Sequence, residues 1–330
     1  MFINKLFKAK KKKFVLHIGT NKTGTTAIQT FLFKNRKKLA EKGINYPNIG
    51  IHGYGHHNIA RALGGQLPSN IGLTDDWINH FVNSTKTADQ TILSSELFHL
   101  EKTPESLNTI FPRNDTLIIL YLRDHVSYLT SWYQQAVQLR NITSSFSEFI
   151  RLDYTQLNYS ILIDKWMKAF NNVSVRSFDR NSFPNGCVIE DFCRSVIPIT
   201  DLDRTLQGVA NPSISGNLLF FKLILNNFIN DSTNHQYAKD IKDMSSLDNN
   251  FQGKISISEA DNKYLNFEYK KDKLNIQKKY SIFFPPPKSL NNMDLFYNQK
   301  TVSRDFKKII SFAKENNLSI YKKIPNFLKK

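Results

Sequence analysis

The first clear pattern along the chain is a short apolar run that stops at a glycine. Residues 14–18 read FVLHI, and Gly19 follows at once. A continuous apolar run between turn residues is typical of a strand buried on both faces, as in a parallel sheet. After a polar turn, apolar residues recur at helical spacing through residues 28–39. The segment therefore predicts a strand, a turn and a helix, in that order.

This alternation of strand and helix patterns continues to about residue 200. Further strands are predicted at 91–93, 116–122 and 173–178. Helical patterns lie between and around them, at 56–63, 104–111, 125–139, 145–170 and 187–196. Beyond residue 200 the strand patterns end, and helices are predicted at 214–228, at 258–280 and in a basic tail. We therefore predict an α/β, P-loop-like three-layer fold with a central parallel sheet flanked by helices, plus a mainly helical C-terminal extension.

Composition is compatible with this fold and narrows the class of protein. The chain has 330 residues, of which 40% are hydrophobic, enough for a sizeable core. Its two cysteines exclude a disulfide framework and a four-cysteine zinc site. No apolar run approaches the roughly 20 residues of a membrane-spanning helix. The N-terminus shows no small-residue cleavage site, so no secretory signal is predicted.

The net charge of +17 is concentrated at the two ends. Residues 1–13 carry +6, residues 263–330 carry +11, and residues 14–262 are neutral. Such ends can contact an anionic membrane, bind a polyanionic substrate or act only as solubilising tails. Nucleic acid is not predicted as a partner, because zinc-finger spacing, an RNP motif and a helix-turn-helix pattern are absent from the sequence. We expect a basic arm at 1–13, a core at 14–200 and a helical basic part at 201–330 packed on that core.

The turn after the first predicted strand has the chemistry of a phosphate-binding loop. Backbone N–H groups of such a turn converge on one point, and the following helix adds its positive dipole end. Gly19 and Gly24 let the backbone curl, and Lys22 adds a full positive charge. The remaining binding candidates are small polar residues of the same turn: Asn21, Thr23, Thr25 and Thr26. The GxxxxG spacing matches a Walker A loop, but Thr25 stands where a nucleotide triphosphatase has lysine, so the predicted ligand is a different anion.

Two segments together resemble sulfotransferases that use 3′-phosphoadenosine 5′-phosphosulfate (PAPS). The pattern GxxKxGTT after a strand is similar to their 5′-phosphosulfate loop. The strand at 116–122 then ends in Leu-Arg-Asp, and Ser131 stands eight residues after Arg123. In that family the arginine and serine hold the 3′-phosphate, and Arg123 is predicted at the carboxyl end of a strand, where open α/β sheets bind ligands. One departure is His125, where the family often has proline.

The resemblance to bacterial carbohydrate-type enzymes of this family covers about residues 14–200 and implies a function. PAPS would be the donor, adenosine 3′,5′-bisphosphate the product, and no metal would be needed. The positive charge of Lys22 would stabilise negative charge on the bridging oxygen of the leaving group. The acceptor would be a hydroxyl or amine of a carbohydrate or glycolipid in bacterial surface polysaccharide biosynthesis, with acceptor-side elements in 201–330. The implied location is cytoplasmic, with peripheral contact to the inner face of the plasma membrane through the basic ends.

Two candidates remain for the base that removes the acceptor proton. Glu96 belongs to a Ser-Ser-Glu segment after a predicted strand and resembles the glutamate base of related enzymes. The same residue can instead favour a helix dipole, with Ser94 or Ser95 as the cap. The rival is the pair His56 and His57, because histidine titrates near neutrality and can also contact the acceptor.

Two functions of other classes also stay open. A P-loop nucleotide kinase would need magnesium and a lysine directly after Gly24, which this sequence does not have. A catalytically inactive protein that binds polyanions or membranes would explain the basic ends. It would not explain Lys22, Arg123 and Ser131 together.

Overall fold

The chain divides into two compact units that alternate along the sequence. The computed structural model describes residues 13–63, 76–140, 142–152, 157–197, 213–229, 235–284 and 297–329. The first unit takes Met1–Arg123, Gln156–Val209 and Asp272–Phe284. The second takes Asp124–Thr155, Ala210–Lys271 and Pro285–Lys330.

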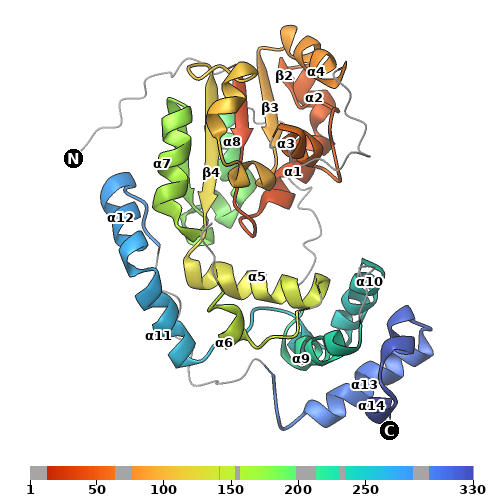
Figure 1. The fold of residues 1–330 in the computed structure, drawn as a ribbon. Helices are drawn as coiled ribbons and strands as arrows, with labels where there is room; N and C mark the ends of the chain where they lie inside the picture. The colour runs from red at the N-terminus through yellow and green to blue at the C-terminus, as the bar shows by residue number, and fades with distance from the viewer. Residues whose placement is uncertain are drawn as a thin grey trace. The chain divides into compact units, whose positions relative to one another are not determined.

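The first unit is built on a parallel sheet of five strands in the order β2-β3-β1-β4-β5 (Figure 1). The strands are β1 (Phe14–His17), β2 (Ile44–Asn45), β3 (Gln90–Ser94), β4 (Thr116–Leu122) and β5 (Asn172–Ser177). The predicted α/β fold with a central parallel sheet is therefore confirmed. The sequence pattern did not predict β2, because two residues are too few to show a period.

Helices flank this sheet (Figure 1). They are α1 (Thr25–Lys34), α2 (Arg36–Ala40), α3 (His57–Leu63), α4 (Asp76–Lys86), α7 (Tyr159–Ala169), α8 (Val188–Val196) and α12 (Lys270–Tyr280), the last from Asp272 on. Two short 3₁₀ helices, η1 (Glu96–Leu100) and η2 (Pro104–Thr109), follow β3. Helices α1 and α8 pack together against the sheet face that carries Val15, Ile119 and Tyr121, whereas α7 packs against β5.

The strand order places a topological switch point between β1 and β4. The chain leaves β1 toward β2 at one edge of the sheet, and it leaves β4 toward β5 at the other edge. Open α/β sheets bind ligands at the carboxyl ends of the two strands on either side of such a point. The loop that begins at Gly19 follows β1, and Arg123 follows β4. Two of the predicted binding elements therefore occupy the position that the topology favours.

Helices are the main elements of the second unit within its described residues, as predicted for the C-terminal extension, and one isolated β-bridge joins Ile214 and Gln252. Its helices are α5 (His125–Leu139), α6 (Phe146–Phe149), α9 (Gly216–Leu225), α10 (His235–Met244), α11 (Glu259–Glu268), α13 (Val302–Glu315) and α14 (Asn326–Lys329). Two buried amides of this unit join segments that are distant in sequence. Gln134 donates from Nε2 to the carbonyls of Ile214 and Gly253, at 3.0 and 2.7 Å. Asn226 donates from Nδ2 to the carbonyl of Ile142, at 2.7 Å.

The sequence predicts a boundary at residue 200, with the core before it and the helical part after it. In the structure, each unit instead combines segments from both sides of that residue. Helix α5 stands between β4 and β5 in sequence, yet its Gln134 side chain is bonded within the helical unit. Conversely, Asp272 accepts from the N–H groups of Tyr159 and Ser160, both at 2.9 Å, and so ties α12 to the start of α7. The predicted helix over 258–280 accordingly breaks between α11 and α12. Residues 1–12 of the basic arm lie outside the described residues.

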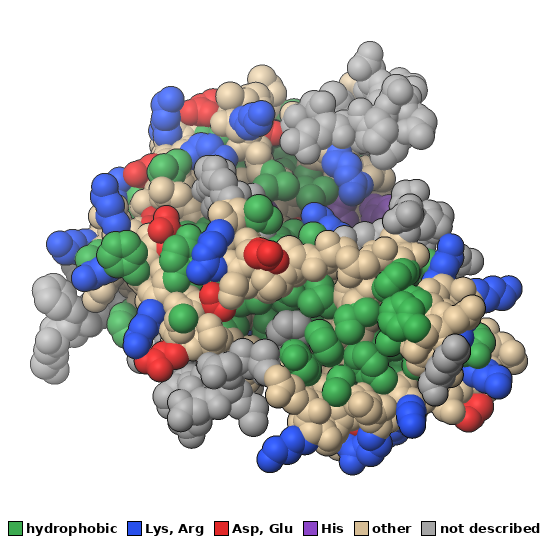
Figure 2. All heavy atoms as spheres, turned by 60° about the horizontal axis from the view of Figure 1, so that its bottom comes forward, with side chains coloured by type: hydrophobic (Ala, Val, Ile, Leu, Met, Phe, Trp, Pro, Cys, Tyr) green, Lys and Arg blue, Asp and Glu red, His purple; other side chains and the backbone are tan. Residues whose placement is uncertain are grey.

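The surface carries apolar and basic side chains side by side. Figure 2 shows hydrophobic side chains gathered in one broad area of the face that it draws, with lysine and arginine around the margin. Large apolar side chains that are more than half exposed include Ile161, Phe267, Phe283 and Phe327. Among the helices of the described ranges, none has the length and apolar character that a transmembrane segment needs.

Candidate active site

The loop between β1 and α1 is held in one conformation by its own threonines. Thr23 donates from Oγ1 to the carbonyl of Thr20, at 2.6 Å. Thr20 donates from Oγ1 to the carbonyl of Tyr121 in β4, at 3.1 Å. Gly19, Lys22 and Gly24 all have positive φ, at 41°, 65° and 76°. Lys22 thus adopts a left-handed conformation that a non-glycine residue takes only at a cost, which the surrounding hydrogen bonds must offset.

The loop ends at the first turn of α1, where N–H groups are available to a ligand. Gly24 is the N-cap, and glycine has no side chain to accept from the N–H groups of the first helical turn. A Cβ at Gly24 would lie 2.9 Å from the Phe178 ring and 3.1 Å from Val188, so only glycine fits here. The N-terminus of a helix with this geometry binds anions through its amides and its dipole.

Lys22 and Arg123 bring two positive charges to this loop. Arg123 donates from Nη1 to the carbonyl of Lys22, at 3.1 Å, and its guanidinium lies 5.9 Å from the centre of the Phe178 ring. Burial lowers the pKa of Lys22, and the charge of Arg123 lowers it further. The two cations therefore repel each other, and a bound anion would reduce that repulsion. The arrangement suits a doubly charged ligand such as a phosphate group.

Glu96 begins η1 directly after β3 and lies beside the same loop. A Cβ at Gly19 would be 3.8 Å from the Cβ of Glu96. Its carboxylate accepts from Nε2 of Gln29 on α1 at 2.9 Å, and Nδ1 of His57 lies 3.9 Å away. The side chains of Glu96 and His57 are 22% and 16% exposed, so both can be reached from solvent. The structure thus brings the two rival bases together at one place.

His57 is held next to Glu96 by the serine that caps η1. Its Nδ1 lies 2.8 Å from Oγ of Ser95, which also accepts from the N–H of Leu97. Burial lowers the pKa of His57; Glu96 opposes that shift, and Arg61 and His52 reinforce it. A neutral imidazole beside a carboxylate can contact a hydroxyl group or accept its proton.

His56 has a structural position, and the interpretation of this residue as a base is not supported. Its Nε2 lies 2.9 Å from the carbonyl of Pro47, and its Nδ1 accepts from the N–H of Ser94 at 3.2 Å. Because a carbonyl only accepts, Nε2 carries the proton and both ring nitrogens are occupied. The ring is fully buried, and burial lowers its pKa to about 4.

His17 supports the candidate site from inside the sheet, a role that was not predicted from the sequence. It is fully buried at the end of β1, and its Nδ1 lies 2.7 Å from Oγ of Ser94. Within the described residues its Nε2 has no hydrogen-bond partner, and it would be 3.6 Å from a Cβ at Gly19. Ser94 is therefore bound by His17 on one side and by His56 on the other, immediately before Ser95 and Glu96. The sequence signal that could have identified His17 is the presence of a histidine inside an otherwise apolar strand.

The remaining predicted residues fall in different places. Thr25 is buried, Thr26 is exposed, and Asn21 is half-buried in the loop. Ser131 is buried on α5 and belongs to the second unit, whereas Arg123 is the last residue of the first segment of the first unit. The role of Ser131 beside Arg123 therefore stays a prediction from the sequence.

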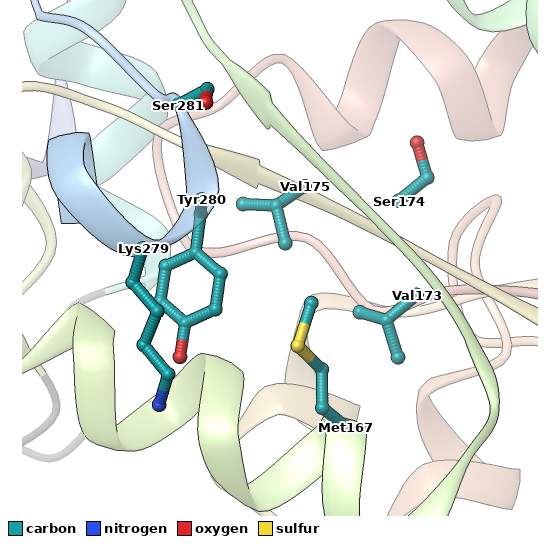
Figure 3. A pocket seen from close by; sticks show the side chains of 7 residues that line it. All are labelled: Met167, Val173, Ser174, Val175, Lys279, Tyr280 and Ser281. Carbon is teal, nitrogen blue, oxygen red and sulfur yellow. The ribbon is translucent and has the colours of Figure 1, made fainter.

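A surface pocket of about 410 Å³ lies elsewhere in the first unit (Figure 3). Its walls come from the end of α7, the first half of β5 and the end of α12: Met167, Val173, Ser174, Val175, Lys279, Tyr280 and Ser281. None of the predicted site residues lines it. Because Val173 and Val175 precede the carboxyl end of β5, this pocket is not at the edge of the sheet where the topology favours ligands.

Acid should destabilise the first unit strongly through three buried histidines. Burial lowers the pKa of His17 to about 3 and those of His56 and His99 to about 4. The unfolded chain binds these protons near pH 6.5, so stability falls as pH drops below that value. Between about pH 7.5 and 5.5 each histidine should remove about 1.4 kcal/mol, or about 4 kcal/mol together. Urea unfolding at the two pH values measures this. The variant His80→Gln changes an exposed histidine and should leave the loss intact, whereas equal stability at both pH values would contradict the burial of these rings.

Comparisons with known proteins assign no family to this chain. No protein-family model matches it. It is 33% identical over 100 residues to a protein of Archaeoglobus fulgidus that is described as uncharacterized. The aligned region covers 30% of this chain and 27% of the archaeal protein, so this chain spans about a quarter of that relative's length.

Proposed function

We propose that this chain is a PAPS-dependent sulfotransferase that acts on a carbohydrate or glycolipid acceptor. The observation that carries the proposal is the convergence of the Gly19–Gly24 loop, Lys22 and Arg123 at the switch point between β1 and β4. The loop offers N–H groups and two cations to a phosphate, and the residue after Gly24 is Thr25 instead of the lysine of a nucleotide triphosphatase. The resemblance of GxxKxGTT and of the Leu-Arg-Asp segment to this family points to the same donor.

In this proposal the loop holds the 5′-phosphosulfate and Arg123 grips the 3′-phosphate. Glu96 removes the proton from an acceptor hydroxyl, whose oxygen attacks the sulfur of the donor. The bond between sulfur and the bridging oxygen breaks, and adenosine 3′,5′-bisphosphate leaves. Lys22 stabilises the negative charge that develops on that bridging oxygen. His57, which lies 3.9 Å from the Glu96 carboxylate, contacts the acceptor in this proposal.

The cellular setting is proposed on the same basis. The acceptor would be an intermediate of bacterial surface polysaccharide synthesis, reached from the cytoplasmic side. The basic segments at 1–13 and 263–330 would favour contact with the inner face of the plasma membrane.

The function is tested by the conversion of donor to product. Incubation with PAPS should release adenosine 3′,5′-bisphosphate slowly through hydrolysis and faster with a suitable acceptor, and EDTA should not change either rate. A P-loop kinase would instead consume ATP and would stop when EDTA removes magnesium. ATP turnover that EDTA abolishes, with PAPS left intact, would refute the proposal.

A further inference from the structure

Helix α12 presents a basic and partly apolar face to solvent. The helix contains five lysines and one acidic residue, Asp272. Asp272 is buried, because its carboxylate accepts from the N–H groups of Tyr159 and Ser160 at the start of α7. The exposed side of the helix is therefore left with positive charge. Lys270, Lys271 and Lys278 are all exposed.

Large apolar side chains stand among these lysines. Leu274 is 43% exposed, and helical spacing places it beside Lys270, Lys271 and Lys278, which are four residues before, three before and four after it. Phe283, three residues beyond the end of the helix, is 60% exposed. An isolated exposed leucine is common on soluble proteins. A leucine among exposed lysines, with an exposed phenylalanine just beyond the helix, forms the combination that binds lipid interfaces.

Side-chain hydrogen bonds hold α12 along α7. Lys279 donates from Nζ to Oδ1 of Asp164 on α7 at 2.5 Å, and the hydroxyl of Tyr280 bonds to the same oxygen. Figure 3 shows the Lys279 ammonium and the Tyr280 hydroxyl pointing to the same side, beside α7. These bonds and the Asp272 contact fix α12 along α7 at two points, so the lysines and apolar side chains are presented on a preformed surface.

We propose that the exposed face of α12, from Lys270 to Phe283, docks on an anionic lipid bilayer. Lysines near such a surface are attracted by its negative potential, and the exposed apolar side chains enter the headgroup region. A soluble polyanion would satisfy the lysines, but it would leave Leu274 and Phe283 without a partner. The apolar residues therefore favour the bilayer. This surface lies within the basic segment 263–330, so the inference rests on and refines the membrane contact proposed for that segment; it is separate from the 1–13 arm and from the loop that begins at Gly19.

The test uses the full chain and vesicles of equal parts phosphatidylcholine and phosphatidylglycerol, with pure phosphatidylcholine as the uncharged control. Lys271→Gln with Lys278→Gln should weaken binding roughly 30-fold, from about 1 kcal/mol per lysine. Leu274→Ser with Phe283→Ser should weaken it by roughly tenfold or more, because both side chains lose their apolar contact. The matched control is Lys37→Gln with Lys38→Gln, which removes the same charge from exposed positions on α2 and should change little.

Each contrary result overturns the proposal. Absence of binding to the anionic vesicles does so directly. A loss with the lysine variants but not with Leu274→Ser and Phe283→Ser, together with equal binding to dextran sulfate, would identify a polyanion surface. A loss only after deletion of residues 1–13 would assign the contact to the arm. All four substituted side chains on α12 and beyond it lie at exposed positions, and thermal unfolding checks that the variants keep the fold.

Discussion

Glu96→Gln is expected to lower turnover by roughly 10²–10⁴, because the amide keeps the size of the side chain but cannot take a proton. Donor affinity should stay nearly constant, since the carboxylate contacts Gln29 and His57 instead of the loop amides. The measurement is the rate of adenosine 3′,5′-bisphosphate release from PAPS, with binding of the bisphosphate as the second readout. Glu105→Gln on η2 is the matched control, because it makes the same change at an exposed ion pair with Lys168.

His57→Ala distinguishes the two candidate bases. If Glu96 is the base, His57→Ala should act mainly on the apparent affinity for the acceptor. If His57 is the base, its removal should abolish turnover, and in the unaltered enzyme the rate should fall as the imidazole becomes protonated. Burial lowers the pKa of His57, so that fall would lie below the ordinary value of 6.5. Full turnover in Glu96→Gln with collapse in His57→Ala would transfer the role to His57.

Arg123→Ala is expected to cost about 2–5 kcal/mol of the binding of adenosine 3′,5′-bisphosphate, as for a charge pair that loses one partner. Adenosine 5′-phosphosulfate, which has no 3′-phosphate, should bind almost as before. Arg113→Ala is the matched control, because Arg113 precedes β4 at the end opposite to Arg123. Calorimetric titration of both ligands measures the difference.

The contact between Arg123 and the loop makes a second variant necessary. Arg123 donates to the carbonyl of Lys22, so alanine also removes a bond that supports the loop. Arg123→Lys keeps the charge and loses the planar fork, and it should recover part of the bisphosphate affinity. Equal losses for the bisphosphate and for adenosine 5′-phosphosulfate would show that Arg123 supports the loop and does not contact the 3′-phosphate.

The local parts of the fold were predictable because their signals are local. A buried strand, a glycine turn and a helix are neighbours in sequence, and β1, the loop and α1 follow that pattern. The predicted helix over 145–170 was wrong as one element, because it contains the starts of two helices. A Ser145 capping box begins α6, and Asn158 caps α7 with help from Asp272, more than a hundred residues away. Contacts between residues that far apart in the sequence leave no periodic pattern in it.

The charged residues of the candidate site were predictable from the sequence. The hydrogen bonds that support them were not. Lys22, Arg123 and Glu96 stand at the ends of predicted strands, so the sequence alone places them at one edge of the sheet. The hydrogen bonds of His17 and His56 to Ser94 depend on the pairing of β1 with β3, in which His17 lies opposite Ser94. That register is set by the packed sheet. The same packing gives the two histidines different environments. Both ring nitrogens of His56 are hydrogen-bonded, whereas His57 lies beside Glu96.

A calorimetric titration with adenosine 3′,5′-bisphosphate, repeated with ATP and magnesium, tests most directly whether the loop binds the product of a PAPS-dependent reaction. The Gly19–Gly24 loop with Lys22 and Arg123 predicts micromolar binding of the bisphosphate, about −8 kcal/mol, that EDTA does not change. Clear preference for ATP with magnesium over the bisphosphate would contradict the sulfotransferase proposal.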